Sequence, residues 1–182
     1  MKPTVGHPKN QTKKIFLLLC CLVFVNLYAQ PKTAPVAGSK TETVIATTLD
    51  KWHEAAANAD FDSYFGYLTP DSHYMGTDAS ENWTLEEFKN FSRPYFNKGK
   101  AWSFTAITRN IYQKKGADMA WFDELLDTQM GICRGSGVVV RINGEWKIQH
   151  YVLSMTVPND QGDKVTLLKK EAEMGLLKKT KK

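Results

Sequence analysis

The sequence predicts an α+β domain in which N-terminal helices pack on a mostly antiparallel sheet. Helix-start signals occur in the first half of the chain, and alternating faces and a hairpin signal occur in the second. Side chains alternate between two faces along residues 118–126. Residues 133–142 and 145–155 flank Asn143 and Gly144, the dipeptide most typical of a two-residue hairpin. We therefore expect these three segments to form successive antiparallel strands.

Two capping boxes predict where helices begin. Ser39 is followed three residues later by Glu42, and Thr84 by Glu87, so each hydroxyl and each carboxylate can satisfy a free backbone N–H group. Asp60 is expected to begin a second, short helix. After Ser39, apolar residues recur at helical spacing and should face the sheet: Ile45, Leu49, Trp52, Ala56 and Ala59.

Residues 1–29 have the organisation of a secretory signal peptide. They contain four lysines and no acidic residue, then an apolar run, and they end in Ala29. The apolar run is too short to span a membrane comfortably. Leu27 lies at the third position before the expected cleavage site and is larger than the small residue usually found at that position, so an uncleaved membrane anchor is the alternative. We expect a bacterial exported protein, periplasmic or secreted, that meets the membrane only transiently through this segment.

The rest of the chain divides into three parts. Residues 30–40, with prolines and a glycine, predict a flexible linker, and residues 41–160 predict the folded domain. Residues 161–182 are rich in lysine and predict a solvated, partly disordered tail. A weak amphipathic helix is the alternative for this tail, although Gly175 would interrupt it.

The charge distribution argues against nucleic-acid binding. The whole chain has 24 basic and 19 acidic residues, a net charge of +5. Without residues 1–29 there remain 20 basic residues against 19 acidic ones, and seven of those lysines lie in residues 159–182. A nucleic-acid interface needs basic residues clustered on the folded domain, and here they lie at the two ends.

The hairpin predicts which residues of its two strands share a face. Cross-strand partners keep the same parity, so His150 and Ser154 are expected on the same face as Cys133. Cys133 would have no intramolecular disulfide partner after cleavage, because the other two cysteines lie within residues 1–29. Its thiol is either a reactive group in a pocket or a small buried hydrophobe.

The preceding strand can be aligned in the same way. If the loop at residues 127–131 places Trp121 opposite Gly137, then Asp123 lies opposite Gly135. The two glycines would then leave room for a bulky ring and a ligand. A slip of one residue would reverse this register.

The same register places an apolar surface on the outer side of the sheet. Glu124 and Arg134 would form a cross-strand ion pair there. The expected apolar residues of this face are Val138, Val140, Tyr151 and Leu153. An apolar face of this size rarely remains in water, so we expect a homodimer formed through the outer sheet face.

Four sequence runs resemble the SnoaL-like proteins of the nuclear transport factor 2-like superfamily. They are AWFDELL, GICRGSGVVVR, GEWKIQHYVLSMTVPND and, at residues 76–84, GTDASENWT. The resemblance covers residues 41–160 and implies a cone-shaped fold with N-terminal helices on a curved sheet. The superfamily includes isomerases, dehydratases, cyclases, ligand binders and dimerisation modules, so the resemblance implies a fold and not one function.

The candidate catalytic residues are Asp123 and His150. Desolvation beside Trp121 would raise the pKa of the Asp123 carboxyl toward the range useful for proton transfer. The resemblance implies a carboxylate of this kind in the cone, which favours Asp123 over Glu124. The alternative is that Asp123 accepts hydrogen bonds and only fixes its strand.

The candidate ligand-binding residues are aromatic or small and polar. Asp78 could instead cap the local backbone of a turn. No motif for a metal or a cofactor is present, and we expect neither. The expected ligand-binding residues are Tyr64, Tyr74, Thr77, Asp78, Trp83, Trp121, Cys133 and Ser154.

Three functions fit these features. The first is binding of a small, partly apolar molecule in a conical pocket. The second is a cofactor-free isomerase, dehydratase or cyclase that uses Asp123 as its general base. The third is a dimeric interaction module whose cone is filled by its own side chains.

Overall fold

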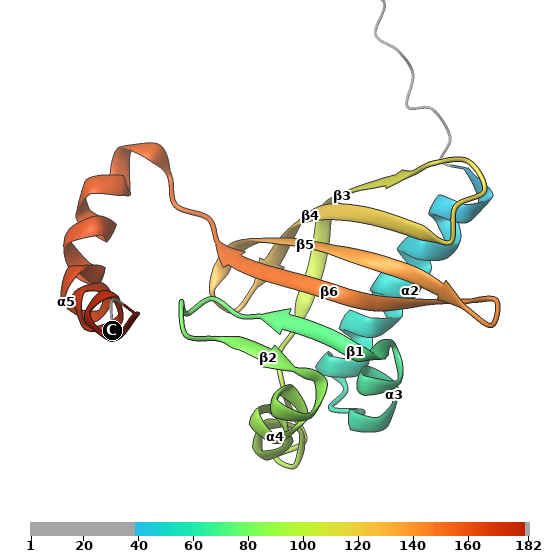
Figure 1. The fold of residues 1–182 in the computed structure, drawn as a ribbon, viewed down its shortest axis with the longest axis horizontal. Helices are drawn as coiled ribbons and strands as arrows, with labels where there is room; N and C mark the ends of the chain where they lie inside the picture. The colour runs from blue at the N-terminus through green and yellow to red at the C-terminus, as the bar shows by residue number, and fades with distance from the viewer. Residues whose placement is uncertain (1–38, 181–182) are drawn as a thin grey trace, which may run out of the picture. The chain divides into compact units, whose positions relative to one another are not determined.

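The computed structural model describes residues 39–180, so the expected signal peptide and most of the expected linker lie outside the described residues. Its elements are α2 (Lys40–Ala57), α3 (Phe61–Gly66), β1 (Leu68–Met75), β2 (Asn82–Thr84), α4 (Leu85–Phe96), β3 (Phe104–Gln113), β4 (Met119–Thr128), β5 (Gly131–Ile142), β6 (Glu145–Met155), the 3₁₀ turn η1 (Asn159–Gln161) and α5 (Gly162–Thr180). The strands form one sheet in the order β2-β1-β6-β5-β4-β3 (Figure 1). Only β1 and β6 pair in parallel. The α+β fold class predicted from the sequence is confirmed.

Both predicted capping boxes are present. In α2 the Ser39 hydroxyl accepts a hydrogen bond from the N–H of Glu42, and the Glu42 carboxylate accepts one from the N–H of Ser39. Thr84 and Glu87 make the same exchange at the start of α4. Backbone N–H groups at the N-terminal ends of both helices are therefore hydrogen-bonded locally, so that the apolar side of each helix can be buried.

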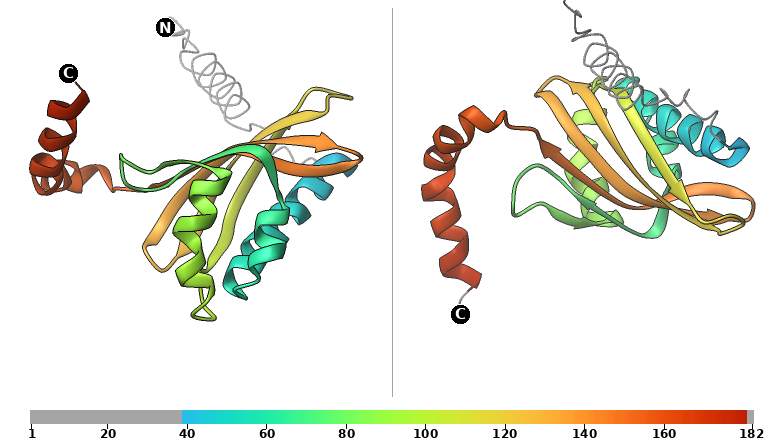
Figure 2. Two further views of the ribbon diagram at one scale, coloured as in Figure 1. Left: turned by 60° about the horizontal axis from the view of Figure 1, so that its bottom comes forward. Right: turned by 90° about the horizontal axis from the view of Figure 1, so that it is seen from above.

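Helices α2, α3 and α4 lie on one face of the sheet (Figure 2). The predicted apolar stripe of α2 is confirmed for its first four positions, because Ile45, Leu49, Trp52 and Ala56 are buried. From the sheet, Phe122, Leu126, Val139 and Ile148 join the same core. The opposite face of the sheet carries none of these three helices (Figure 2).

The predicted hairpin between β5 and β6 is confirmed. Asn143 and Gly144 both have positive φ, 52° and 88°, as a two-residue type I′ turn requires. The strands leave this turn with Ile142 paired to Glu145.

The predicted register of β4 against β5 is wrong by one residue. Trp121 pairs with Val138 and Asp123 with Ser136, while Glu124 pairs with Gly135. The reason is the length of the turn: β4 runs to Thr128, which pairs with Gly131, so the connection contains only two unpaired residues. Because side chains alternate with a period of two, this single step exchanges the faces of the whole strand. Glu124 therefore faces the helices, and Asp123 faces away from them.

A second irregularity lies in β6. Val139 pairs with Ile148 but Val138 pairs with His150, so Gln149 is an extra residue in the ladder. Beyond this bulge the parity of β6 is inverted. Tyr151 is consequently buried under the helices, while His150 lies on the outer face.

The two glycines of β5 make room for protein side chains. A Cβ atom at Gly135 would lie 2.2 Å from the Tyr151 hydroxyl, and one at Gly137 would lie 2.3 Å from the His150 carbonyl oxygen. Any larger residue would clash at either position. The expectation that this space holds a ligand is wrong, since Glu124, Tyr151 and Phe122 pack against the two glycines.

Residues 162–180 form α5, so this part of the tail is the helix that was the alternative to a partly disordered segment. Its apolar side chains are largely exposed, Leu167 by 71% and Leu168 by 84%. None of the helices in residues 39–180 is both long and apolar enough to cross a membrane.

Candidate functional site

The strongest concentration of buried charge surrounds Glu124, in the middle of β4. Its side chain is fully buried, and its Oε1 accepts a hydrogen bond of 3.0 Å from the hydroxyl of Tyr151. The same oxygen lies 2.9 Å from Nε2 of His53, and Oε2 accepts a hydrogen bond of 2.8 Å from Nε of Arg109. Because these partners belong to β6, α2 and β3, one carboxylate connects three elements.

Arg109 extends the cluster to the N-terminal half of α2. Its Nη1 donates to the carbonyl oxygen of Ala46 at 3.1 Å and to the carboxylate of Asp50 at 2.7 Å. The guanidinium is therefore held between an exposed carboxylate and a buried one. This places a positive charge next to Glu124, which a buried carboxylate needs in order to remain ionised.

The electrostatics keep Glu124 charged. Burial by itself would raise the pKa of Glu124, but the hydrogen bonds and charges of His53 and Arg109 outweigh it and lower that pKa below its usual value. Burial, followed by the charge of Glu124, raises the pKa of Tyr151 well above its usual value, so its hydroxyl stays protonated and donates. Both carboxylate oxygens are thus occupied, and Glu124 serves to hold α2 on the sheet.

The two predicted catalytic residues lie outside this interior. Asp123 accepts hydrogen bonds from the Asn110 amide and the Tyr112 hydroxyl, both 3.0 Å long, on the outer face of the sheet. His150 lies opposite Val138 on that face, and not opposite Asp123. The expectation that Asp123 and His150 line the cone is wrong, because the turn after β4 and the bulge in β6 place both on the other side.

The remaining predicted ligand-binding residues fall into three groups. Trp121, which stacks on Tyr112, and Ser154 lie on the outer face, where they cannot meet a ligand inside the cone. Tyr64 and Cys133 are buried in the core, with exposed fractions of 1% and 0%. The thiol of Cys133 lies 3.6 Å from the Thr128 hydroxyl, in the position of a small buried hydrophobe.

The third group borders an open cavity between α4, β1–β2 and the turn after β4. We call it the aromatic pocket; it is lined by Tyr74, Gly76, Thr77, Glu81, Trp83, Phe88, Phe91, Trp102, Phe104, Gln129, Met130 and Leu153. Three residues predicted from the sequence, Tyr74, Thr77 and Trp83, are brought together here. Asp78 is exposed beside the pocket, where it caps the turn by accepting hydrogen bonds from Ser80.

The walls of the aromatic pocket are rings from several elements. Phe88 of α4 stacks on Tyr74 of β1 with centroids 4.0 Å apart and planes inclined by 16°. Trp83 of β2 stacks on Phe91 of α4 at 4.4 Å. The cavity volume is about 150 Å³, and a cavity of about 150 Å³ holds a benzene-sized group.

A carboxylate lies at the rim of the aromatic pocket. Glu81 is half-buried, and its Oε2 accepts a hydrogen bond of 3.1 Å from the N–H of Asp78. A Cβ atom at Gly76 would lie 2.1 Å from that same oxygen. The glycine therefore allows the carboxylate to lie directly on the β1 backbone at the edge of the cavity.

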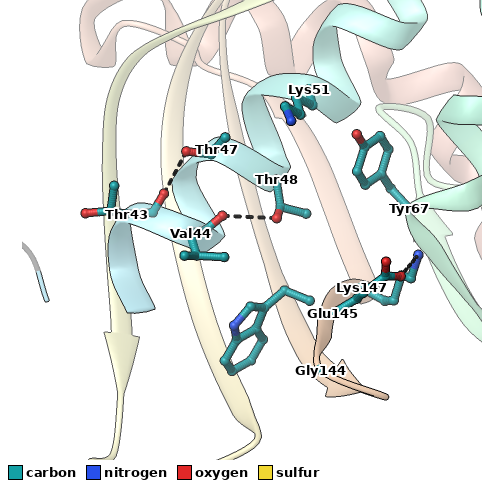
Figure 3. A pocket seen from close by; sticks show the side chains of 10 residues that line it. Thr43, Val44, Thr47, Thr48, Lys51, Tyr67, Gly144, Glu145 and Lys147 are labelled. Atoms are coloured by element: carbon teal, nitrogen blue, oxygen red, sulfur yellow. Dashed lines mark hydrogen bonds and ion pairs between the residues drawn. The ribbon is translucent and has the colours of Figure 1, made fainter. Parts of the chain in front are cut away.

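A larger cavity, of about 390 Å³, lies between α2 and the β5–β6 turn (Figure 3). Two of its hydroxyls are bound by their own helix, since Thr47 and Thr48 donate to the carbonyl oxygens of Thr43 and Val44. Glu145 and Lys147 form an ion pair with each other. These two threonine hydroxyls and the Glu145–Lys147 pair are already bonded, which makes this cavity a weaker candidate. Within residues 39–180, no group of three His, Cys, Asp or Glu side chains is placed to hold a metal ion.

Several residues of the aromatic pocket were not predicted from the sequence. Phe88 and Phe91 are three residues apart on α4, and such spacing alone is typical of the buried side of a helix and not of a binding site. Glu81 lies within the GTDASENWT run, but no sequence pattern indicates that it is a binding residue. Its neighbour Gly76, which lacks a side chain at a point of close approach, was the available indication.

Comparison with solved structures identifies the fold as that of the NTF2-like proteins. An NTF2-like protein of unknown function from Pseudomonas putida shares 13% identity at a TM-score of 0.57, over 68% of this chain and 92% of that one. An NTF2-like protein from Cytophaga hutchinsonii shares 18% identity at a TM-score of 0.54, over 63% and 98%. A candidate NTF2-like dehydratase from Streptomyces avermitilis shares 12% identity at a TM-score of 0.55, over 64% and 96%. At these identities the likeness shows the fold alone.

The family follows from the sequence itself. The model of the SnoaL-like domain matches residues 45–158, which is more than half of the chain, so the protein belongs to the SnoaL-like domain family. No curated protein matches the chain significantly. Membership in this family points to ligand binding or to isomerase or dehydratase activity, and the geometry of the site is needed to choose among these classes.

Replacing Glu124 tests the buried cluster. Glu124→Gln should lower the free energy of unfolding at pH 7 by about 3 kcal/mol, because it leaves the Arg109 charge without its buried partner. Since folding lowers the pKa of Glu124, its contribution is present above the unfolded value of about 4.3 and is lost as the pH falls through the folded pKa. The difference between wild type and variant should therefore shrink on acidification below about pH 4.

Urea unfolding at pH 7 and at acidic pH, followed by tryptophan fluorescence, measures both effects. Glu86→Gln is the matched control, since Glu86 is exposed and pairs only with Lys89 on α4. Equal stability of the two variants at pH 7 would show that Glu124 is not an interior charge.

Proposed function

We propose that the protein binds a small, partly apolar molecule in the aromatic pocket. The observation that carries this proposal is the composition of the pocket wall. Six of its twelve lining residues are aromatic, and its few polar side chains lie among those rings. A mostly apolar cavity with a small number of placed polar groups is typical of small-molecule sites.

Binding is better supported than catalysis by Asp123. A general base has to reach the proton that it removes, and Asp123 lies on the outer face with both carboxylate oxygens accepting hydrogen bonds. The interior carboxylate, Glu124, is bound by three partners and is not among the residues lining the pocket. Neither carboxylate therefore supplies the acid–base group that an isomerase, dehydratase or cyclase of the expected kind needs.

Two tryptophans provide a matched test of the pocket. Trp83→Ala should abolish the binding of a copurifying small molecule, because Trp83 lines the pocket, whereas Trp121→Ala should retain it. Native mass spectrometry of the protein purified from its own host without denaturant shows whether a reproducible extra mass is present in each variant.

Circular dichroism of both variants establishes that they are folded. Loss of the extra mass in Trp121→Ala but not in Trp83→Ala would contradict the proposal. So would a wild-type protein that carries no extra mass and shows no thermal stabilisation by any compound of a small-molecule panel.

We also propose that the outer sheet face packs against a second copy of the chain. A row of side chains crosses this face from strand to strand: Tyr112, Trp121, Val138, His150 and His73. Trp121 is 45% exposed and Tyr112 is 42% exposed. A broad face with exposed aromatic residues is unusual on a monomer, and a twofold axis allows the same row to meet itself.

A charge in the middle of this row tests the dimer. Val138→Asp should convert a dimer into a monomer, because pairing two copies would bury two like charges against apolar side chains. Leu167→Asp is the control, since Leu167 lies on α5 and is already 71% exposed. Analytical ultracentrifugation at micromolar concentration measures the mass, and a monomeric wild type would refute the dimer.

Export is the third part of the proposal. The basic and apolar composition of residues 1–29 supports a cleaved signal peptide. The intact mass of the protein recovered from the exported fraction should then correspond to a chain that begins at Gln30. Recovery of the uncleaved chain from the membrane fraction would favour the anchor instead.

A further inference from the structure

The aromatic pocket has a charge asymmetry that narrows the class of its ligand. Among its twelve lining residues Glu81 is acidic, and none is lysine, arginine or histidine. Glu81 is half-buried and takes part in no ion pair with the side chains of residues 39–178. The one hydrogen bond of its carboxylate within residues 39–178 comes from the backbone N–H of Asp78, which donates to Oε2. A carboxylate at the edge of a cavity is therefore left without a countercharge.

The rings around the cavity add to the same electrostatic preference. The faces of aromatic rings carry partial negative charge and attract cations within about 6 Å of the ring centroid. Trp83 and Phe88 are nearly parallel, at 13° with centroids 5.5 Å apart, and Trp102 continues the series at 23° to Phe88 and 5.9 Å. Tryptophan is the strongest cation-binding ring of the three types, and two tryptophans line this cavity.

The other polar lining groups are neutral. Burial, followed by the charge of Glu81, raises the pKa of Tyr74, so its hydroxyl stays protonated. Thr77 and Gln129 carry no charge. An anionic ligand would thus meet ring faces and a carboxylate, with no cation to compensate it.

We propose that the aromatic pocket binds the alkylammonium group of its ligand, with the charge facing Glu81 and the methyl or methylene groups against Trp83 and its neighbouring rings. This inference rests on the proposed binding function and specifies its ligand class. The cavity volume of about 150 Å³ suits a head group such as a methylated ammonium, with the rest of the ligand outside. Aromatic walls are used by proteins to recognise quaternary ammonium ligands, and the Glu81 carboxylate would add the attraction of an opposite charge.

A charged ligand and its neutral isostere separate this inference from simple apolar binding. Choline and 3,3-dimethylbutan-1-ol have nearly the same shape, but only choline carries a positive charge. Isothermal titration calorimetry of the full-length protein should show that choline binds about tenfold or more tightly than the alcohol. Glu81→Gln should weaken choline binding by a similar factor and leave binding of the alcohol unchanged.

Glu86→Gln is the matched control, because Glu86 is an exposed carboxylate on α4 outside the pocket lining, and it should leave choline binding unchanged. Equal affinity for choline and the alcohol would overturn the alkylammonium inference while leaving the pocket as an apolar binding site. No choline binding, together with a copurifying mass that Trp83→Ala removes, would also overturn it while supporting the proposed function.

A second experiment, cosedimentation with phosphatidylcholine vesicles, decides whether the alkylammonium group belongs to a soluble ligand or to a lipid head group. Binding of free choline without cosedimentation with phosphatidylcholine vesicles would assign a soluble ligand. Cosedimentation that Glu81→Gln abolishes would assign a lipid head group. Both results support the alkylammonium class.

Discussion

The rest of the structure depends on one buried carboxylate. Glu124 lies beneath α2 in the middle of β4, and its ionised form is stable there only because His53, Arg109 and Tyr151 reach it from three different elements. Burying an unpaired charge would cost far more than a surface ion pair contributes, so the three partners have to be present together. Gly135 belongs to the same arrangement, because any side chain there would occupy the position of the Tyr151 hydroxyl.

This arrangement limits where a ligand can bind. The cone interior beneath α2 is filled by the cluster and by Trp52, which contacts Tyr151 edge to face at 4.8 Å. The aromatic pocket lies farther along the sheet, where Tyr74 stacks on Tyr151 on one side and lines the pocket on the other. The charged cluster is thus separated from the pocket by a layer of rings. We infer that the interior charge maintains the fold and that recognition occurs in the pocket beside it.

The sequence predicted the elements well because their signals are local. A capping box needs four residues, and Asn143-Gly144 needs two, so neither depends on the rest of the fold. Tyr74 and Trp83 were both predicted as ligand-binding residues, and they pair with each other between β1 and β2.

The faces of β4 and β6 could not be predicted in this way. A two-residue connection after Thr128 and one extra residue at Gln149 each shift the register by one step, and each step exchanges the two faces. Nothing in the local sequence pattern distinguishes Asp123 from Glu124, because each lies between apolar residues on its own face of the strand. The two residues are distinguished by tertiary contacts, because His53 and Arg109, which are distant in sequence, contact Glu124 and not Asp123.

The most direct test of this account is a ¹³C NMR titration of the carboxyl carbon of Glu124, assigned by comparison with the Glu124→Gln variant. Glu124 should titrate below the usual glutamate range, because the charges and hydrogen bonds of His53 and Arg109 outweigh burial. A titration above that range would show that burial dominates and that the carboxyl is protonated near neutral pH. Glu124 would then be a candidate proton donor, and the division between a structural interior and a binding pocket would be wrong.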